Sequence, residues 1–245
     1  MNAMILAAGL GTRLGSIGRS TPKALIDVGG RPLLERSLDY LQRQGISRVV
    51  INLHHHAARI ESFLRSYDGQ LQVVPVREQQ LLGTAGSVRN ALQHLEPGPF
   101  LVLYGDVLVE EPLDSLIEFH LRTRPLATLA VHEAESAEGK GVVEVDATGR
   151  VRSFAEKERR DPGRVLINAG IYVLESKLLA PIAPGFACDF GEDVFPRAVA
   201  RGSAIFAFRL ADPVIDIGTP DGLALARSRA SAGAAAAGGG GPARL

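Results

Sequence analysis

The sequence predicts an α/β fold, a three-layer sandwich in which helices cover both faces of a mixed, mostly parallel sheet. Three observations support this prediction. In the first half, short apolar runs alternate with longer helical patterns. In the second half, the apolar runs follow one another through short turns, which favours antiparallel or mixed pairing. The chain has 245 residues, of which 46% are hydrophobic, enough to bury the core of one large domain.

The elements of the first half follow in order. Each predicted strand is a continuous apolar run, as expected of parallel strands that are covered on both faces. Each predicted helix has apolar residues at three- and four-residue spacing, and the first of them stops at Gly45. The predicted strands are 3–9, 48–53, 71–76 and 99–106, and the predicted helices are 31–45, 56–67 and 83–95.

The second half is predicted to be richer in strands. The predicted strands are 126–133, a hairpin within 141–157, 165–175 and 203–210, with a helix at 190–202 and a strand, loop and helix within 214–230. We expect the folded domain to span 1–228. The segment 229–245 is rich in alanine and glycine without a hydrophobic pattern, so we expect a disordered tail there.

Charge and cysteine content narrow the range of partners. The chain carries 27 lysines and arginines and 27 aspartates and glutamates, without a long basic or acidic run, which argues against nucleic-acid or membrane-surface binding. The single cysteine, Cys188, cannot form an intrachain disulfide. The N-terminus lacks a signal-peptide pattern and no run is long enough to span a bilayer. We therefore expect a soluble cytoplasmic protein, and a homodimer is compatible with this.

A glycine loop follows the first predicted strand. Gly9 and Gly11 resemble the start of a dinucleotide-binding fingerprint, but Leu14 replaces its third glycine. The second strand ends in 52–54, Asn-Leu-His, without the acidic residue that would bind a ribose. A P-loop needs Gly-Lys followed by Ser or Thr, whereas 139–141 reads Gly-Lys-Gly. Both of these motifs are therefore disfavoured.

Two cations accompany the loop. Arg13 follows it directly, and Lys23 comes ten residues later. Backbone N–H groups of a glycine turn can bind phosphate oxygens. Two fixed cations beside a triphosphate suit a reaction in which pyrophosphate leaves and negative charge must be spread. Taken singly, either residue could be an ordinary surface charge; together with the loop they predict a triphosphate site.

Two carboxylates end predicted strands far apart in the chain. Asp106 closes the strand at 99–106, and Asp216 follows an apolar run at 214–215. The carboxyl ends of parallel strands form the ligand crevice of an α/β sheet, and Mg²⁺ bound to nucleotide phosphates takes one or two protein carboxylates. A turn or capping role is the alternative for each. The three adjacent histidines at 54–56 cannot all face one ion, so we expect a loop there.

The stretch "LAAGLGTRLGSIGRSTPKALIDVGGRPLLE" resembles the signature of the sugar-1-phosphate nucleotidylyltransferases. The resemblance continues in the expected order through "LLGTAG", "LYGDVL", "FAEK", "INAGIYVL" and "VIDIGTPDG", and covers nearly all of 1–228. One departure is that "LGSIG" lacks the proline that many members have after "TRL". The resemblance implies a Rossmann-like sandwich of the nucleotidyltransferase type, and it is closest to mannose- and heptose-1-phosphate guanylyltransferases.

The resemblance also implies a reaction. A sugar 1-phosphate oxygen attacks the α-phosphorus of a nucleoside triphosphate, and pyrophosphate leaves. The nucleophile is already anionic, so positioning and charge neutralisation replace a general base. By resemblance, Arg13 serves the leaving β- and γ-phosphates, Lys23 the α-phosphate, and Lys157 the sugar phosphate. Asp106 and Asp216 correspond to the family's Mg²⁺ ligands.

Further positions follow from the matched motifs. The nucleotide-binding residues implied are Leu6, Ala7, Ala8, Gly9, Gly11, Thr12, Glu78, Gly83, Thr84 and Gly105. The sugar-binding residues implied are Gly141, Glu156, Asn168 and Gly170. The acidic segment 189–193 could add acceptors for sugar hydroxyls, or it could be a helix N-terminus at which the dipole favours acidic residues.

The position of Glu78 bears on the choice of base. It lies five residues before Gly83, where uridylyl- and thymidylyl-type relatives tend to carry glutamine. Guanine presents two adjacent N–H donors that one carboxylate can accept, whereas uracil and thymine present one donor flanked by acceptors. The sequence therefore favours GTP, with UTP, dTTP or CTP as alternatives, and Gln79 or Gln80 could be the reader instead. A catalytically silent regulatory subunit of the same fold is the non-enzyme alternative, but the key cations and aspartates are all present.

Overall fold

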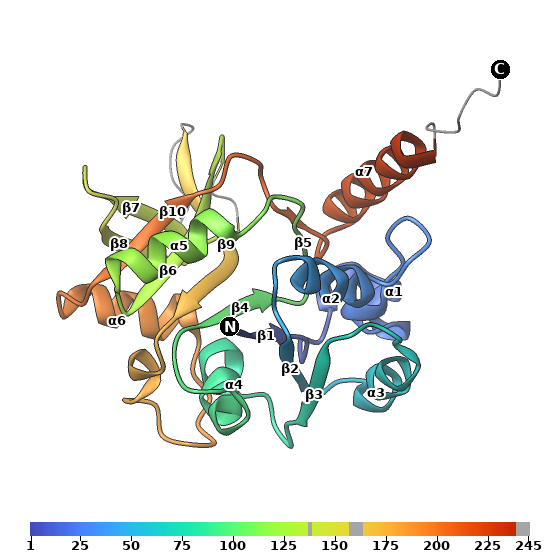
Figure 1. The fold of residues 1–245 in the computed structure, drawn as a ribbon, viewed down its shortest axis with the longest axis horizontal. Coiled ribbons are helices and arrows are strands. Elements are labelled where there is room, and N and C mark those ends of the chain that lie inside the picture. Colours follow the sequence, from blue (N-terminus) through green and yellow to red (C-terminus); the bar gives the residue numbers. More distant parts are fainter. Residues whose placement is uncertain (137–138, 157–163, 239–245) are drawn as a thin grey trace.

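The structure is a computed structural model that describes residues 1–136, 139–156 and 164–238, with the backbone alone for Ser16, Arg19 and 232–238. Its centre is a nine-stranded sheet with the main path β10-β6-β9-β4-β1-β2-β3, and β7 and β8 form a hairpin beside β9 (Figure 1). The strands of the sheet are β1 Asn2–Leu6, β2 Arg48–Leu53, β3 Gln72–Arg77, β4 Phe100–Tyr104, β6 Ala127–Ala134, β7 Val142–Val145, β8 Val151–Ala155, β9 Val165–Leu174 and β10 Ile205–Arg209.

The pairing is mixed and mostly parallel, as the sequence predicted. Strands β3, β2, β1 and β4 are parallel neighbours, and β10 is parallel to β6. Strand β9 lies antiparallel between β4 and β6. A separate two-stranded ribbon joins β5 (Val107–Leu108) to β11 (Ile215–Asp216), and it brings together two segments that are distant in sequence.

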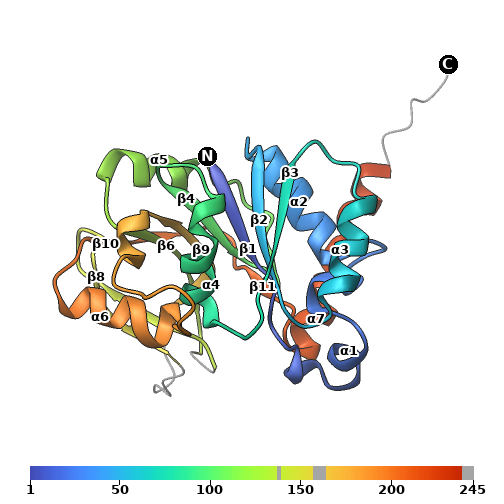
Figure 2. The same cartoon turned by 90° about the horizontal axis from the view of Figure 1, so that it is seen from below.

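Helices cover both faces of the sheet, which confirms the three-layer sandwich (Figures 1 and 2). Helices α2, α3 and α5 pack on one face, in a core that contains Ile5, Ile51 and Leu103. Helices α4 and α6 pack on the other face, in a core that contains Met4 and Val102. The helices are α1 Gly15–Ser20, α2 Leu33–Arg43, α3 Ala57–Ser66, α4 Gly83–Ala91, α5 Asp114–Thr123, α6 Phe195–Ala200 and α7 Pro220–Gly238.

Three helical segments differ in detail from the sequence prediction, and the first is the short helix α1, because no helix was predicted at 15–20. Helix α5 was not predicted, although Leu113, Leu116 and His120 are buried at helical spacing. The helix predicted at 190–202 is divided into a π-helical turn, Phe190–Val194, and α6. The side chain of Asp189 accepts hydrogen bonds from two backbone N–H groups of that turn, which supports the helix N-terminus interpretation of the acidic segment.

The C-terminal boundary also differs from the prediction. Helix α7 continues to Gly238, past the domain boundary expected at residue 228. Ala226 and Ala230 are buried in a third apolar cluster with Leu14 and Ile217, and alanine has the highest helix propensity. This packing holds α7 against the domain as far as Ala230, past the boundary expected at residue 228. Residues 239–245 lie outside the described structure.

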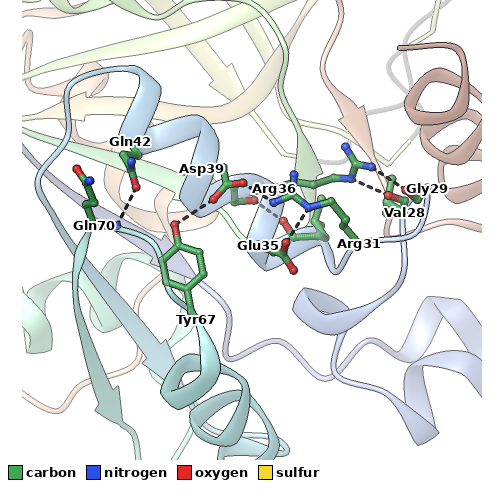
Figure 3. Close-up of polar contacts among 11 residues, drawn as sticks. Val28, Gly29, Arg31, Glu35, Arg36, Asp39, Gln42, Tyr67 and Gln70 are labelled. Carbon is green, nitrogen blue, oxygen red and sulfur yellow. Dashed lines mark hydrogen bonds and ion pairs between the residues drawn. The ribbon is translucent and has the colours of Figure 1, made fainter. Parts of the chain in front are cut away.

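The segment after the glycine loop is anchored on α2 (Figure 3). Arg31 forms ion pairs with Glu35, at 2.7 Å, and with Asp39. Asp39 also accepts a hydrogen bond from the Tyr67 hydroxyl at 3.1 Å, which links α2 to the end of α3. These contacts hold the turn that leads from the glycine loop into the first helix layer.

Candidate active site

The site is built at the carboxyl edge of the sheet. Leu6 lies opposite Asn52 on one side and Tyr104 on the other, so β1, β2 and β4 end in register. The loops that follow these strands therefore start side by side, which is where α/β sheets bind ligands. Two adjoining cavities lie at this edge, one of about 290 Å³ and one of about 180 Å³. Tyr104 and Asp106 line both of them.

The larger of the two cavities is lined by most of the predicted nucleotide-binding residues, together with Lys23. They are Leu6, Ala7, Ala8, Gly9, Gly83, Thr84 and Gly105. Gly11, Thr12 and Glu78 do not line it. Gly11 has a φ of 69°, and a side chain there would come within 3.2 Å of Lys23 Cγ, so glycine at this position lets the chain turn and leaves room for the lysine.

The smaller cavity collects the predicted sugar-binding residues. Its lining includes Arg13 and Asp216 together with Gly141, Glu156, Asn168 and Gly170. A Cβ at Gly141 would lie 2.7 Å from Glu156 Oε2, so glycine is needed for the Glu156 carboxylate to occupy its place. Lys157, predicted to bind the sugar phosphate, lies outside the described residues.

Cations and carboxylates alternate where the cavities meet. Lys23 Nζ donates to Asp106 Oδ2 at 2.8 Å, and both side chains are largely buried, at 14% and 23% exposure. Arg13 Nη2 lies 3.7 Å from Asp216 Oδ2. The point where a Cβ of Gly218 would stand is 2.7 Å from Asp216 Oδ1, 2.9 Å from Lys23 Nζ and 3.0 Å from Arg13 Nη2. The two pairs thus converge around the space that Gly218 leaves open.

This donor set fits a magnesium ion bound through nucleotide phosphates. Asp106 and Asp216 supply hard carboxylate oxygens, and Mg²⁺ commonly takes only one or two of these from the protein, with phosphates and waters completing its shell. In the parts of the chain that the structure describes, no group of three or more His, Cys, Asp and Glu side chains could hold a metal ion by itself. His54, His55 and His56 accordingly form no such cluster.

The predicted base reader lies behind the cavity wall. Glu78 is 7% exposed, and its Oε1 accepts a hydrogen bond from Asn52 Nδ2 at 3.0 Å. Its Oε2 is buried and has no hydrogen-bond partner among the residues that the structure describes. Asn52, in contrast, lines the cavity, and its Oδ1 accepts from the Ala7 N–H at 2.8 Å. Sequence reasoning missed Asn52, although its position at the end of a strand could have suggested it.

Tyr104 forms part of the wall that the two cavities share, and the buried Tyr172 packs against it. The rings of Tyr104 and Tyr172 meet edge to face with centroids 5.7 Å apart, and burial raises the pKa of both phenols, so they remain neutral. Asn168 Nδ2 donates to the Tyr172 hydroxyl at 2.7 Å, and Asn168 Oδ1 accepts from the Gly170 N–H. The wall therefore orients Asn168 in the smaller cavity.

Two other lining residues were absent from the sequence prediction as individual contacts. His132 is 6% exposed in the smaller cavity, and burial, assisted by the charge of Lys140, lowers its pKa and favours the neutral imidazole. Asp189 lines the larger cavity and accepts from Thr84 Oγ1 at 2.8 Å. The segment 189–193 therefore reaches the nucleotide side through Asp189, while Glu192 and Asp193 do not line the sugar side.

Comparison with known proteins decides the family. The family model described as nucleotidyl transferase matches residues 2–232. The chain belongs to this family. That finding confirms the resemblance seen in the sequence motifs, and the match extends beyond residue 228, as α7 does.

The relatives of this nucleotidyl transferase chain are named for two different activities. Mannose-1-phosphate guanylyltransferase 1 of Arabidopsis thaliana is 33% identical over 226 residues, which cover 90% of this chain and 62% of that protein. UTP–glucose-1-phosphate uridylyltransferase of Synechocystis sp. is 32% identical over 240 residues, which cover 90% of this chain and 61% of that protein. The chain thus spans about three fifths of the length of these relatives.

One solved structure matches this chain over nearly the whole length of both proteins. It is HddC from Yersinia pseudotuberculosis complexed with GMP-PN, which is 29% identical with a TM-score of 0.81, and the match covers 93% of this chain and 98% of that one. This similarity confirms the nucleotidyltransferase type of fold. Within the described ranges, every helix is too short or too polar to cross a bilayer.

Proposed function

We propose that this chain transfers a nucleoside monophosphate from a nucleoside triphosphate to a sugar 1-phosphate, giving a nucleoside-diphosphate sugar and pyrophosphate. The observation that carries this proposal is the pair of adjoining cavities with Asp106 in their common wall. One cavity is lined by the glycine loop and Lys23, and the other contains Arg13 and Asp216. A reaction that joins two phosphate-bearing substrates needs this kind of junction.

The residues at the junction would work by positioning and charge. The ammonium of Lys23, held 2.8 Å from Asp106, lies where it can neutralise the phosphate under attack. Arg13 is half-exposed beside Asp216, and its guanidinium can stabilise the negative charge that develops on the leaving pyrophosphate. Asp106 and Asp216 would hold Mg²⁺, which supplies charge neutralisation on the phosphate oxygens when bound.

GTP is the triphosphate that we favour. Glu78 occupies the predicted base-reading position, a guanylyltransferase is among the similar proteins, and a related structure is complexed with GMP-PN. For the sugar we favour a mannose- or heptose-type 1-phosphate or a related cyclitol phosphate. Because a uridylyltransferase is about equally similar, UTP is the first alternative, followed by dTTP and CTP.

The experiment is a substrate panel with Mg²⁺, in which pyrophosphate release is measured for each pair of a nucleoside triphosphate and a sugar 1-phosphate. We expect turnover with GTP and a mannose- or heptose-type phosphate. If no pair gave product, the proposed activity would be refuted. Turnover with UTP or dTTP but not with GTP would refute the inference that Glu78 indicates a preference for GTP.

Substitution of the two aspartates tests the metal assignment. Asp106→Asn and Asp216→Asn should each lower kcat/KM by more than the about 10- to 100-fold that is typical of residues that only orient metal ligands. The matched control is Asp68→Asn, which changes an exposed aspartate outside both cavities. If either site variant kept the activity of the Asp68→Asn control, that aspartate would not be a ligand.

Beyond the two substrates and a second copy of this chain, we propose no partner. The balanced net charge gives no basis for a nucleic-acid or membrane-surface partner. We propose that the protein works in the cytoplasm, which cell fractionation tests, and that it forms a homodimer, which light scattering on the purified chain tests.

A further inference from the structure

A single amide links the glycine loop to the predicted base-reading carboxylate. Asn52 is 2% exposed and lies near the end of β2, between β1 and β3 in the sheet. Its Oδ1 accepts from the backbone N–H of Ala7, at 2.8 Å, and its Nδ2 donates to Glu78 Oε1, at 3.0 Å. Both partners belong to segments that were predicted to bind the nucleotide, and Asn52 itself lines the larger cavity.

The two hydrogen bonds fix the orientation of the Asn52 amide. Turning it over would set its NH₂ group against the Ala7 N–H and its oxygen against the Glu78 carboxylate, which makes two repulsive contacts. Only a side chain with an acceptor at one end and a donor at the other meets both neighbours. The position therefore requires an amide, and this amide locks two separate parts of the cavity to each other.

The carboxylate behind the amide is only partly satisfied. Within the described parts of the chain, Glu78 Oε2 is buried and has no hydrogen-bond partner, and an unmet buried acceptor is costly. The main chain of Glu78 is held as well, since His54 Nδ1 lies 2.9 Å from its carbonyl oxygen. Glu78 thus has one oxygen held by Asn52 and the other buried behind the cavity wall, so its negative charge is only partly compensated by the described residues.

We propose that Asn52 is a positioning residue that sets the base preference of the nucleotide cavity. It fixes the Glu78 carboxylate directly behind the cavity wall, where the negative charge favours a base that offers N–H donors on that side, and it holds the Ala7 amide at the start of the phosphate-binding loop. This inference rests on the proposed function for the identity of the ligand. It goes beyond that function by assigning specificity to a hydrogen-bonded pair and not to Glu78 by itself.

The test is direct nucleotide binding, by titration calorimetry with GTP and UTP in the absence of a sugar phosphate. Asn52→Asp keeps an acceptor for the Ala7 N–H but loses the donor to Glu78, and places two carboxylates side by side. We expect Kd for GTP to rise about 10- to 100-fold at pH 8, and the GTP-to-UTP preference to fall. Because paired buried carboxylates share a proton, binding should recover as the pH is lowered toward 6.

A reversal variant tests the pair itself. In Asn52→Asp/Glu78→Gln the introduced amide can donate to the introduced carboxylate, so the hydrogen bond is restored with opposite polarity and the pair again carries one charge. We expect the variant to fold and to recover UTP binding to within about threefold of the wild type, without the pH dependence, while the GTP preference stays lost. This variant also keeps the proposal testable if Asn52→Asp does not fold.

Gln42→Ala is the matched control, because Gln42 Oε1 on α2 accepts from the Gln70 backbone N–H at 3.1 Å (Figure 3), and neither residue lines either cavity. Its Kd values should equal those of the wild type. The proposal is overturned if Asn52→Asp weakens GTP and UTP equally without pH dependence, or if the reversal variant keeps the GTP preference. Wild-type binding of GTP without turnover on any sugar phosphate would refute the proposed function alone.

Discussion

Replacing Gly105 with alanine is expected to push apart two central strands where they end at the nucleotide cavity. The Gly105 N–H donates to the Leu6 carbonyl at 2.9 Å, and a Cβ on Gly105 would stand 2.6 Å from that oxygen and 3.3 Å from Ala7 Cα. The clash is with backbone, so rotation of a side chain cannot relieve it. Strands β1 and β4 must separate by several tenths of an ångström at the position that holds the glycine loop.

The magnitude follows from overpacking. Forcing an extra carbon into a packed site typically costs about 1–3 kcal/mol. For a domain of this size each kcal/mol lowers Tm by about 2–4 °C, so Gly105→Ala should lower Tm by about 2–12 °C. The KM for the nucleotide should rise as well, because Ala7 and the glycine loop shift with the strand end.

The assay is thermal unfolding together with steady-state kinetics. Gly9→Ala serves as the control for stability, because a Cβ there meets nothing within 4 Å and the residue has no positive φ. Its Tm should equal that of the wild type, although it narrows the cavity. A Gly105→Ala protein with unchanged Tm and unchanged KM would refute the reasoning, since it would show that the strand ends absorb the methyl group without strain.

Three further predictions follow from buried contacts. Tyr172→Phe removes the acceptor of the Asn168 amide and should cost about 1–2 kcal/mol in unfolding free energy and raise the sugar-phosphate KM; an unchanged KM would contradict a role for that hydrogen bond. Burial lowers the pKa of His120 despite the nearby Glu175, so the unfolded chain binds the proton more readily and stability should fall as the pH drops below 6.5. Denaturant titrations at several pH values should show that the free energy of unfolding falls less for His120→Gln than for the wild type. An equal fall with pH in both proteins would refute this. Ala230→Asp should lower Tm while Leu225→Asp, at an exposed site of α7, should not; equal Tm values would mean that α7 contributes nothing beyond residue 228.

Local patterns in the sequence were enough to predict the strands and several helices. Strands β1, β2 and β4 are buried on both faces, and the continuous apolar runs that this requires can be read directly. Composition does not show that Ala230 packs into an apolar cluster, within a helix that the structure describes to Gly238. Helix α5 was missed, although its apolar spacing was present in the sequence.

The candidate site could likewise be predicted only in part from the sequence. The glycine loop with Arg13, and the two aspartates at strand ends, were identifiable because their chemistry is local to each motif. The hydrogen bond between Lys23 and Asp106 joins residues 83 positions apart, and nothing in either motif specifies it. The link from Ala7 through Asn52 to Glu78 was likewise invisible, because it depends on the order and register of three strands.

The sequence by itself determined the alternation of apolar strands with helices. It also determined which chemical groups the chain can offer: a glycine loop with neighbouring cations, and carboxylates where strands end. Only the tertiary structure decided how these groups meet. It placed Arg13, Lys23 and Asp216 around the gap left by Gly218, and it set Glu78 behind Asn52. The physical reason is that hydrogen bonds and ion pairs act over a few ångströms of space, whereas sequence patterns report only on neighbours along the chain.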